Sequence, residues 1–508
     1  MTQPSPTADS LTRALSPSST PSLAPDTRRP AWLLGAGSAV VASVFFAVLA
    51  LGRWNAGNSA DYDLGIFAQG ADAWSRGHWP VSHIRGLSLL GDHFSPLLAT
   101  WGLVWRIWPT PPALLITQSV LLGAALGVIV GYARRRAGWK VAVLIAVVGI
   151  FSRAVLTTAM FDVHEVAYAA IALAVLCIAL LQHRFGWAVG AAVWLVLTKE
   201  DLGLTVFAAG CCWWWMYRSE GWRRPLILAA IGFAGVIAAM LVIGAFAPGS
   251  GTGYLAYFGI GKSNKLPVPE DHSLSPQRLL PVLMYVVLAL VVGVRSKLTL
   301  LAIPTLLWRA VSSNIHYWAL DFHYDVILWP IGLLAFVDVV ASHRGLSAAL
   351  SSARNERVSK GRARNEPVSK PGPAVWEIAT VGVAVLAGFG LAVSEMADRS
   401  VAPASLFRAA PVVTNIRSLA ADHLPKDARV ATQADVGAYL VPAYDAYSLR
   451  PDQHPSVDYV MFTSKPKWLY QVPQCAKDKL IREGALVWRR GTVTLVKLDH
   501  RQRVTPSC

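Results

Sequence analysis

The sequence predicts a mostly α-helical, polytopic membrane protein with about eleven spans and a small extracytoplasmic α/β domain at its C-terminal end. Of its 508 residues, 54% are hydrophobic and only 15% are charged, which is typical of membrane proteins rather than soluble globules. Long apolar runs alternate with short polar connections, and basic residues recur in every second connection. This alternation indicates topology, because Lys and Arg are retained on the cytosolic side.

The first apolar run, 31–51, follows a Ser-, Thr- and Pro-rich segment, 1–29, that we expect to be a disordered cytosolic tail. A cleaved signal peptide is the alternative. However, the tail is long, the run has about 20 residues, and no small-x-small cleavage site stands out after it. These features favour an uncleaved anchor.

Ten further apolar runs complete the predicted spans. They lie at 112–133, 139–159, 165–182, 186–198, 202–217, 224–246, 279–294, 298–311, 324–341 and 374–393. Several are shorter than the roughly 20 residues that cross a bilayer, so one or two re-entrant segments are an alternative. The semi-apolar stretch 95–108 is expected along the membrane surface. The resulting division is a transmembrane domain (30–341), a basic cytosolic linker (342–373), a last span (374–393) and an extracytoplasmic domain (394–508).

The distribution of basic residues predicts the orientation. Clusters occur at Arg28-Arg29, Arg134-Arg135-Arg136, His183-Arg184, Arg218 with Arg223-Arg224, Arg295 with Lys297, and throughout the linker. The positive-inside rule then places the N-terminus in the cytosol and the C-terminus outside. Because the basic residues are not gathered in one stripe, the net charge of +16 does not indicate nucleic-acid binding.

Acids and histidines collect in the other connections, on the predicted outer side. They form the motifs DYDLGIF (61–67), GDHFSP (91–96), FDVHE (161–165), TKED (198–201) and NIHYWALDFHY (314–324). At the bilayer centre each charge would cost roughly 2.5–3.5 kcal/mol. We therefore expect these motifs at the outer ends of the spans, where they can line a shared polar cavity.

Asp61 and Asp63 are the candidate catalytic residues. Asp63 opens an amphipathic stretch whose apolar positions suit a helix lying in the membrane interface. For a lone acid, a helix N-cap beside a solvated neighbour is the simpler explanation. In the functional alternative, the acid is a general base that takes a proton from an acceptor hydroxyl.

FDVHE supplies three candidate substrate-binding residues, Asp162, His164 and Glu165. Helix capping explains one acid at the start of a span, but not a second acid and an imidazole. The three are also ligand types for a divalent cation, although their spacing is not a specific metal signature. Cation binding is therefore a minor alternative for this motif.

The other candidate substrate-binding residues belong to three motifs. Lys199 suits a phosphate group, with Glu200 and Asp201 holding it in place, while a local interfacial ion cluster is the alternative. Five further residues are ordinary interfacial residues when taken alone. They are Asp92, His93, His316, His323 and Tyr324.

The polar C-terminal region predicts a small α/β module. ARVATQ (428–433) and VDYVMF (457–462) predict strands, and ALVWRRGTVTLVKL predicts a hairpin that turns at Arg490-Gly491. A helix is expected within KWLYQVPQCAKDKLIREG. If this region is extracytoplasmic, Cys475 and Cys508 can form a disulfide.

Several of these motifs together resemble a known family. YDLGIFAQ, GDHFSPLL, PPALLITQ, FDVHE and LTKEDLGL, followed by HY before a Pro-containing span, are similar to the bacterial multi-pass membrane proteins grouped as domain of unknown function 2079. The resemblance covers about residues 55–340 well and the C-terminal domain loosely. That family in turn resembles the GT-C superfamily of integral-membrane glycosyltransferases.

The resemblance implies transfer of a sugar from a polyprenyl-phosphate donor to a hydroxyl of an extracytoplasmic glycan or protein. Asp63 would be the acid of the first loop, with Asp61 as its rival because a contiguous acid pair is absent. Asp162, His164 and Glu165 would line the cavity. Lys199 and His323 would face the lipid phosphate. A divalent cation is the only cofactor that the residues suggest.

Two other functions stay open at this point. A transporter or flippase for a lipid-linked substrate would place polar groups at the midplane on broken helices, often with an internal repeat. Here the polar groups lie at outer span ends, and no convincing repeat relates the two halves. The other alternative is a non-catalytic envelope assembly protein that binds partners through its outer domain.

Overall fold

The computed structural model describes residues 28–246, 271, 273, 275–359, 390–399, 401–450, 453–464 and 472–508. Several predictions fall outside these residues. They are nearly all of the N-terminal tail, the larger part of the outer loop 247–278, residues 360–373 of the linker, and most of the last span, 374–393.

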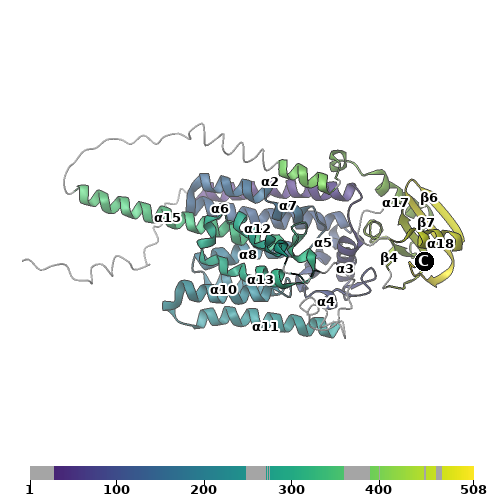
Figure 1. Cartoon of the computed structure of the whole chain (residues 1–508), viewed down its shortest axis with the longest axis horizontal. Coiled ribbons are helices and arrows are strands. Elements are labelled where there is room, and N and C mark those ends of the chain that lie inside the picture. Colours follow the sequence, from purple (N-terminus) through teal and green to yellow (C-terminus); the bar gives the residue numbers. More distant parts are fainter. Residues whose placement is uncertain are drawn as a thin grey trace, which may run out of the picture.

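Most of the chain forms a bundle of helices, and a small sheet domain lies at one end of it (Figure 1). The bundle helices are α2 (Arg28–Asn55), α6 (Pro111–Phe151), α7 (Arg153–Ala159), α8 (Val166–Leu181), α9 (Phe185–Val196), α10 (Leu202–Tyr217), α11 (Arg223–Phe246), α12 (Leu280–Leu288), α13 (Ile303–Val311) and α15 (Leu328–Ser359). Short helices α3 (Ile66–Ser75), α4 (Leu89–Asp92) and α5 (Ala99–Ile107) lie at the end that faces the sheet domain (Figure 1). At the opposite end, α15 extends beyond the bundle.

Fewer helices than expected are long enough to cross a bilayer. In the described part of the chain, four are long and apolar enough: Ala31–Asn55, Pro111–Phe151, Arg223–Phe246 and His323–His343. Val166–Leu181, Phe185–Val196 and Pro276–Leu288 are apolar but shorter. The predicted spans 112–133 and 139–159 share α6, which Gly138 interrupts with a φ of 86°. Glycine adopts this left-handed conformation at little cost, so the helix breaks where the sequence placed a connection.

Small residues let neighbouring bundle helices approach closely. A Cβ on Gly35 of α2 would lie 2.7 Å from the Gly127 carbonyl oxygen of α6. A Cβ on Gly232 of α11 would lie 2.4 Å from the Gly203 carbonyl oxygen of α10. Such backbone contact is typical of membrane helices, where van der Waals packing rather than water exclusion holds helices together.

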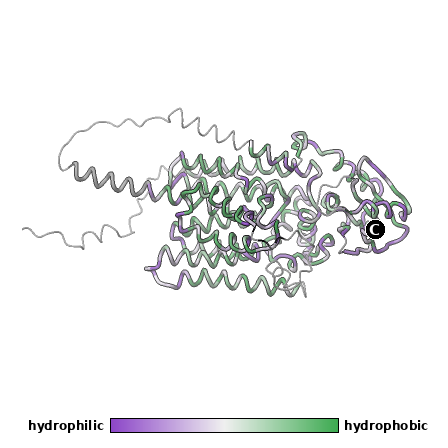
Figure 2. The backbone as a smooth tube through the Cα atoms, in the orientation of Figure 1, coloured by the Kyte–Doolittle hydropathy of each residue, from purple (hydrophilic) through white to green (hydrophobic). Residues whose placement is uncertain are grey.

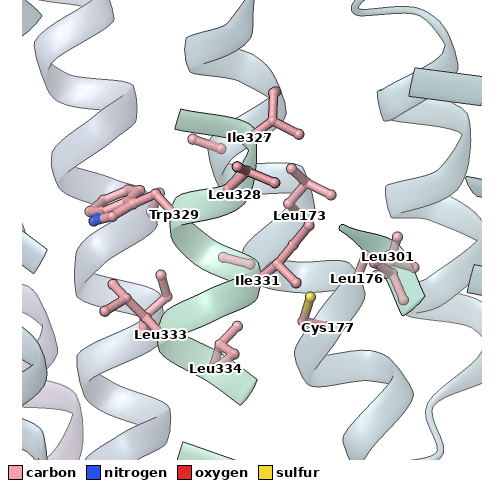
Figure 3. Packing of buried hydrophobic residues seen from close by; sticks show 14 of the residues in the cluster. Leu173, Leu176, Cys177, Leu301, Ile327, Leu328, Trp329, Ile331, Leu333 and Leu334 are labelled. Atoms are coloured by element: carbon pink, nitrogen blue, oxygen red, sulfur yellow. The ribbon is translucent and has the colours of Figure 1, made fainter. Parts of the chain in front are cut away.

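The interior of the bundle is apolar. Figure 3 shows Leu173 and Cys177 of α8 beside Ile331 of α15, while Trp329 projects from the other side of α15; all four are buried. Figure 2 shows the same contrast over the whole chain, with apolar helices in the bundle and more hydrophilic segments in the sheet domain. Because α15 is fixed by this packing, the turn before it, η9 (His323–Ile327), has a defined position at the top of the core.

The sheet domain has five strands in the order β4-β3-β5-β7-β6. Its strands are β3 (Arg429–Thr432), β4 (Asp445–Ser448), β5 (Ser456–Thr463), β6 (Leu486–Arg490) and β7 (Val493–Arg503). β3 pairs parallel with β4 and β5, and β7 pairs antiparallel with β5 and β6. Helices α17 (Pro411–His423) and α18 (Gln474–Glu483) complete the α/β module.

The sheet domain follows the sequence-based expectations closely. β3 and β5 coincide with the predicted strands, and the β6–β7 hairpin turns at Gly491, whose φ is 59°. Cys475 and Cys508 form a disulfide with their Cα atoms 5.6 Å apart. Alternation of apolar residues and a glycine at the turn are local signals, so this part needed no long-range information.

Candidate functional site

The first loop carries Asp61 and Asp63 in a short π-helical turn, η2 (Asp61–Gly65), just before α3. The two acids have different surroundings. Asp61 is fully buried, and its backbone N–H donates to the Ala434 carbonyl oxygen of the sheet domain at 2.7 Å. The side chain of Asp63 is 23% exposed, and its Oδ1 lies 3.5 Å from Nε2 of His164. Of the two predicted catalytic acids, Asp63 is therefore the one that an outside molecule can reach.

FDVHE precedes α8 and brings Asp162 beneath the first loop. Asp162 lies 3.0 Å from an Arg53 guanidinium nitrogen and accepts the Ala60 backbone N–H at 2.9 Å. Burial raises the pKa of Asp162 to about 6, although the charge of Arg53 opposes the rise. The side chain is almost completely buried. Asp162 thus fixes the loop to the bundle, with its carboxylate directed to Arg53 and to the Ala60 backbone.

His164 and His323 come from distant parts of the sequence and stack on one another. Their ring centroids are 3.6 Å apart, and the Phe161 ring packs against both imidazoles. The backbone N–H of His164 donates to Oε1 of Gln118 in α6 at 2.8 Å. Packing against His323 and Phe161 holds the plane of the His164 ring, and its Nε2 lies 3.5 Å from Asp63 Oδ1.

The TKED segment between α9 and α10 holds the cationic group of the site. The Lys199 ammonium group donates to the Glu165 carboxylate, and its side chain is 12% exposed. Burial favours the neutral amine, but the charges of Glu165 and Glu200 prevail, so the pKa of Lys199 is raised and it stays protonated. Lys199 is therefore a positive charge held by Glu165, on a side chain that is partly exposed.

Glu200 faces another element and holds a third predicted residue. Its Oε1 is 3.0 Å from Nδ1 of His93, and its Oε2 accepts the Phe94 backbone N–H at 3.2 Å. Burial opposes ionisation, but His93 and Lys199 lower the pKa of Glu200 to about 2. Glu200 was predicted to hold Lys199 in place. In the structure it also anchors the 91–96 segment, through His93 and the Phe94 backbone.

Asp201 ends the TKED segment and begins α10 without a side-chain capping bond. Burial and the neighbouring Glu200 raise the pKa of Asp201 to about 6, against the charge of Lys199. In the described part of the chain, its Oδ1 has no hydrogen-bond partner. The side chain of Asp201 is therefore partly buried, with a pKa raised towards neutrality, two positions after the protonated Lys199.

These residues form one group, which we call the polar cluster. Lys199 contacts Glu165, and the adjacent Glu200 lies 3.0 Å from His93. His164, next to Glu165 in the sequence, lies 3.5 Å from Asp63 and stacks on His323, whose ring centroid is 4.3 Å from that of Tyr324. The members of the polar cluster are Asp63, His93, His164, Glu165, Lys199, Glu200, His323 and Tyr324. Five segments far apart in the sequence thus meet next to the sheet domain.

Three predicted site residues have other partners. Asp92 accepts two hydrogen bonds from Arg85, each 2.9 Å long. His316 packs edge-on against Phe322, with ring centroids 4.7 Å apart. Asp162 pairs with Arg53, as described above. The sequence does not reveal that arginines pair with two of these residues or that an aromatic ring packs against the third.

The arrangement does not support the predicted cation site of Asp162, His164 and Glu165. Asp162 pairs with Arg53 and Glu165 with Lys199, so their carboxylates point to different cations. Over the described ranges, no group of three or more His, Cys, Asp or Glu residues is arranged to hold a metal ion. The three residue types fit a divalent ion, but their positions do not converge.

Sequence reasoning missed the buried arginines around the site. Arg309 of α13 is fully buried and lies 2.6 Å from Asp325, and Arg53 at the end of α2 pairs with Asp162. Arg309 falls inside the predicted span 298–311. An ionisable residue within an apolar run indicates a functional or structural site, so Arg309 could have been identified from the sequence.

Comparisons with known proteins agree with the architecture. A family model described as "Predicted membrane protein (DUF2079)" matches residues 57–474. The crystal structure of ArnT from Cupriavidus metallidurans bound to undecaprenyl phosphate has a similar fold, with a TM-score of 0.50 and 13% sequence identity. That match covers 91% of this chain and 97% of ArnT. The apo structure of the same ArnT gives a TM-score of 0.47 and 14% identity, covering 91% and 98%. A search of curated proteins finds no match.

Proposed function

Because the chain belongs to the DUF2079 family of predicted membrane proteins and has a GT-C fold similar to that of ArnT, we propose that it is an integral-membrane glycosyltransferase. It moves a sugar from a polyprenyl-phosphate donor to a hydroxyl of an extracytoplasmic glycan or protein. The observation that carries the proposal is the polar cluster, where the partly exposed side chains of an acid, Asp63, and a lysine, Lys199, belong to one group. The undecaprenyl phosphate bound to ArnT supports the class of donor.

Asp63 is the general base of the proposed reaction. As the acceptor oxygen attacks the anomeric carbon, its proton passes to the Asp63 carboxylate and the new C–O bond forms. The bond between the anomeric carbon and the phosphate oxygen breaks, and polyprenyl phosphate leaves with the electron pair. The exposure of Asp63 and the nearby Nε2 of His164 support this role. His164 orients the carboxylate through that contact.

Lys199 stabilises the departing phosphate. A fixed positive charge near a developing phosphate charge lowers the barrier without reorganisation during the reaction. The contact with Glu165 holds the ammonium group in place, and an ammonium group has three donors, so donors remain for a phosphate. His323, which stacks on His164, and Tyr324 beside it are additional donors of the polar cluster.

The proposed orientation puts the polar cluster and the sheet domain outside the cytosol, in the cell membrane. α6 begins at Pro111 and reaches Arg134-Arg135-Arg136 after about 35 Å of helix, given a rise of 1.5 Å per residue. This length separates the basic cluster from the α5 end by roughly a bilayer thickness. The positive-inside rule then supports a cytosolic N-terminus.

Transfer from a set of donors tests the proposal. Purified protein in lipid is incubated with radiolabelled polyprenyl-phosphate sugars and a cell-envelope acceptor fraction, and wild type is compared with Asp63→Asn. We expect one donor to be consumed by wild type, and loss of the base to lower kcat by about 10²- to 10⁴-fold. Asp72→Asn is the matched control, because Asp72 lies on α3 with its carboxylate bonded to Arg76 and Trp105.

The same experiment separates the alternatives. If a folded wild type consumes no donor, the transferase proposal is wrong. Movement of an intact lipid-linked sugar between leaflets, unaffected by Asp63→Asn, would then indicate a flippase. Equal loss of transfer in Asp63→Asn and Asp72→Asn would instead contradict the assignment of the base.

A further inference from the structure

The sheet domain contacts the first loop through Tyr439. This buried tyrosine stacks on Trp54, with ring centroids 4.2 Å apart. Its hydroxyl donates to the Trp54 carbonyl oxygen at 3.0 Å and accepts the Ser59 backbone N–H at 3.2 Å. One side chain from the far end of the sequence therefore bridges both ends of the segment 54–59, which turns at Gly57 with a φ of 77°.

A second contact reaches the residue that opens the catalytic turn. The Ala434 carbonyl oxygen accepts the Asp61 backbone N–H at 2.7 Å. Gly437 lies so close that a Cβ there would be 2.7 Å from both the Asp61 Cβ and the Thr432 Oγ1. Asp61 is thus enclosed by the sheet domain, and Asp63 follows only two residues later in the same turn.

The opposite side of the loop is held by the bundle. Asp162 accepts the Ala60 backbone N–H and pairs with Arg53, which lies just before the loop. Three consecutive backbone N–H groups, at Ser59, Ala60 and Asp61, therefore donate alternately to the sheet domain, the bundle and the sheet domain. These three hydrogen bonds hold the backbone before Asp63 against both domains, which fixes the position and orientation of the turn that carries Asp63.

We propose that the sheet domain is a working part of the catalytic centre, and that Tyr439 is the positioning residue that sets the Asp63 carboxylate. This inference rests on the proposed function and deepens it. The hydroxyl of Tyr439 acts through the backbone of residues 54–61 and does not touch substrate. A general base needs a defined distance to the acceptor hydroxyl, and a misplacement of about 1 Å costs on the order of 10²-fold in rate.

Removal of one hydroxyl tests the proposal. Tyr439→Phe keeps the ring stacked on Trp54 but removes both hydrogen bonds. The matched control is Tyr444→Phe, because the Tyr444 hydroxyl donates to the Ala420 carbonyl oxygen, also at 3.0 Å, within the sheet domain itself. Two quantities are measured for each protein: kcat and KM for the donor, and hydrogen exchange of the backbone amides of residues 59–63.

In Tyr439→Phe we expect faster exchange at residues 59–63 and a fall in kcat of about 10- to 100-fold. KM for the donor should change less than about twofold, because Lys199 and its partners are untouched. Tyr444→Phe should leave both kcat and the exchange of this loop at wild-type values. Because Tyr439→Phe can also weaken docking of the domain, Gly437→Ala is a second variant that presses on Asp61 from the same side and should lower kcat likewise.

The two measurements distinguish the failures. Unchanged exchange at residues 59–63 in Tyr439→Phe overturns the positioning role, whether or not any donor is turned over. Faster exchange with unchanged kcat also overturns it, while leaving the transferase proposal intact. If wild type consumes no donor but Tyr439→Phe loosens the loop, the transferase proposal is wrong and the catalytic role of Tyr439 falls with it.

Discussion

Two kinds of ion pair lie in or around the polar cluster, and they differ in the exposure of their side chains. Arg53–Asp162 and Arg309–Asp325 are closed, with every side chain at most 4% exposed. Asp63 and Lys199 are open, with side chains 23% and 12% exposed beside buried partners. A closed pair has no face left for a ligand, so its role is to hold segments together. An open pair keeps one charged group available, which is what transfer chemistry needs.

The largest expected effect tests the open pair. Asp63→Asn should reduce kcat by about 10²- to 10⁴-fold while leaving thermal unfolding within about 0.5 kcal/mol of wild type. The reason is that Asp63 is partly solvated and not enclosed by a salt bridge. Differential scanning fluorimetry in detergent, run beside the transfer assay, measures both. A large loss of stability would place Asp63 with the closed pairs.

Variants of the closed pairs should mainly lose stability. Arg309→Leu leaves Asp325 buried without its cation and should destabilise the protein by about 3–5 kcal/mol. Replacing both residues by leucine should recover much of that loss, since the uncompensated charge is gone. Thermal unfolding of the single and double variants measures this. Equal instability of the two variants would mean that Arg309 stabilises through its other contacts, such as the Tyr317 carbonyl oxygen.

Lys199 and Glu165 allow a finer test, because they form one pair with different exposure. If Lys199 contacts phosphate, Lys199→Gln should lower kcat/KM for the donor by about 10²-fold, and Glu165→Gln by about tenfold or less. Both variants break the same ion pair. Similar losses for the two would indicate a structural pair and would remove Lys199 from the proposed chemistry.

Asp201 predicts a pH dependence of stability. Its pKa is raised from 3.8 to about 6, so folding favours the protonated acid. The associated stabilisation is fully present below about pH 4 and is lost as the pH rises through about 6. Relative to Asp201→Asn, wild type should therefore lose about 2–3 kcal/mol between pH 4 and 7. Thermal unfolding across this range checks the prediction, and a difference that does not vary with pH would contradict it.

The smallest effect is expected at the surface. Arg76 and Asp72 form an exposed pair one helical turn apart on α3. Arg76→Ala should change stability by less than about 0.5 kcal/mol and leave transfer unchanged. A large effect on kcat would show that α3 itself is part of the site. Exposure of the pair would then not predict which ion pairs matter for transfer.

The sequence predicted the strands and hairpin of the sheet domain from local alternation, and it brought Asp63, His164, Lys199 and His323 to one side. What it could not predict was which of the two acids in the first loop is buried and which is partly exposed. The sequence favoured Asp63 and kept Asp61 as a rival, and the difference in their burial comes from Ala434 and Gly437, more than 370 positions later. The arginine partners of Asp92 and Asp162 were missed for the same reason, because the orientation of a side chain depends on tertiary contacts.

The lengths of α8 and α9 follow the predicted runs 165–182 and 186–198 to within two residues. The two helices have 16 and 12 residues and are too short to cross a bilayer by themselves, as the short runs indicated. Polar motifs separate these helices from their neighbours where the polar cluster forms. The irregular backbone is tolerated there because its polar groups have protein partners.

The most direct test of the account compares Asp63→Asn with Asp162→Asn in one experiment. Turnover of the donor and thermal unfolding are measured for both variants and for wild type. The account predicts that Asp63→Asn loses transfer and keeps its stability, while Asp162→Asn loses stability and, when folded, keeps more activity than Asp63→Asn. If Asp162→Asn abolishes transfer without destabilising the protein, while Asp63→Asn remains active, the assignment of open and closed pairs is wrong.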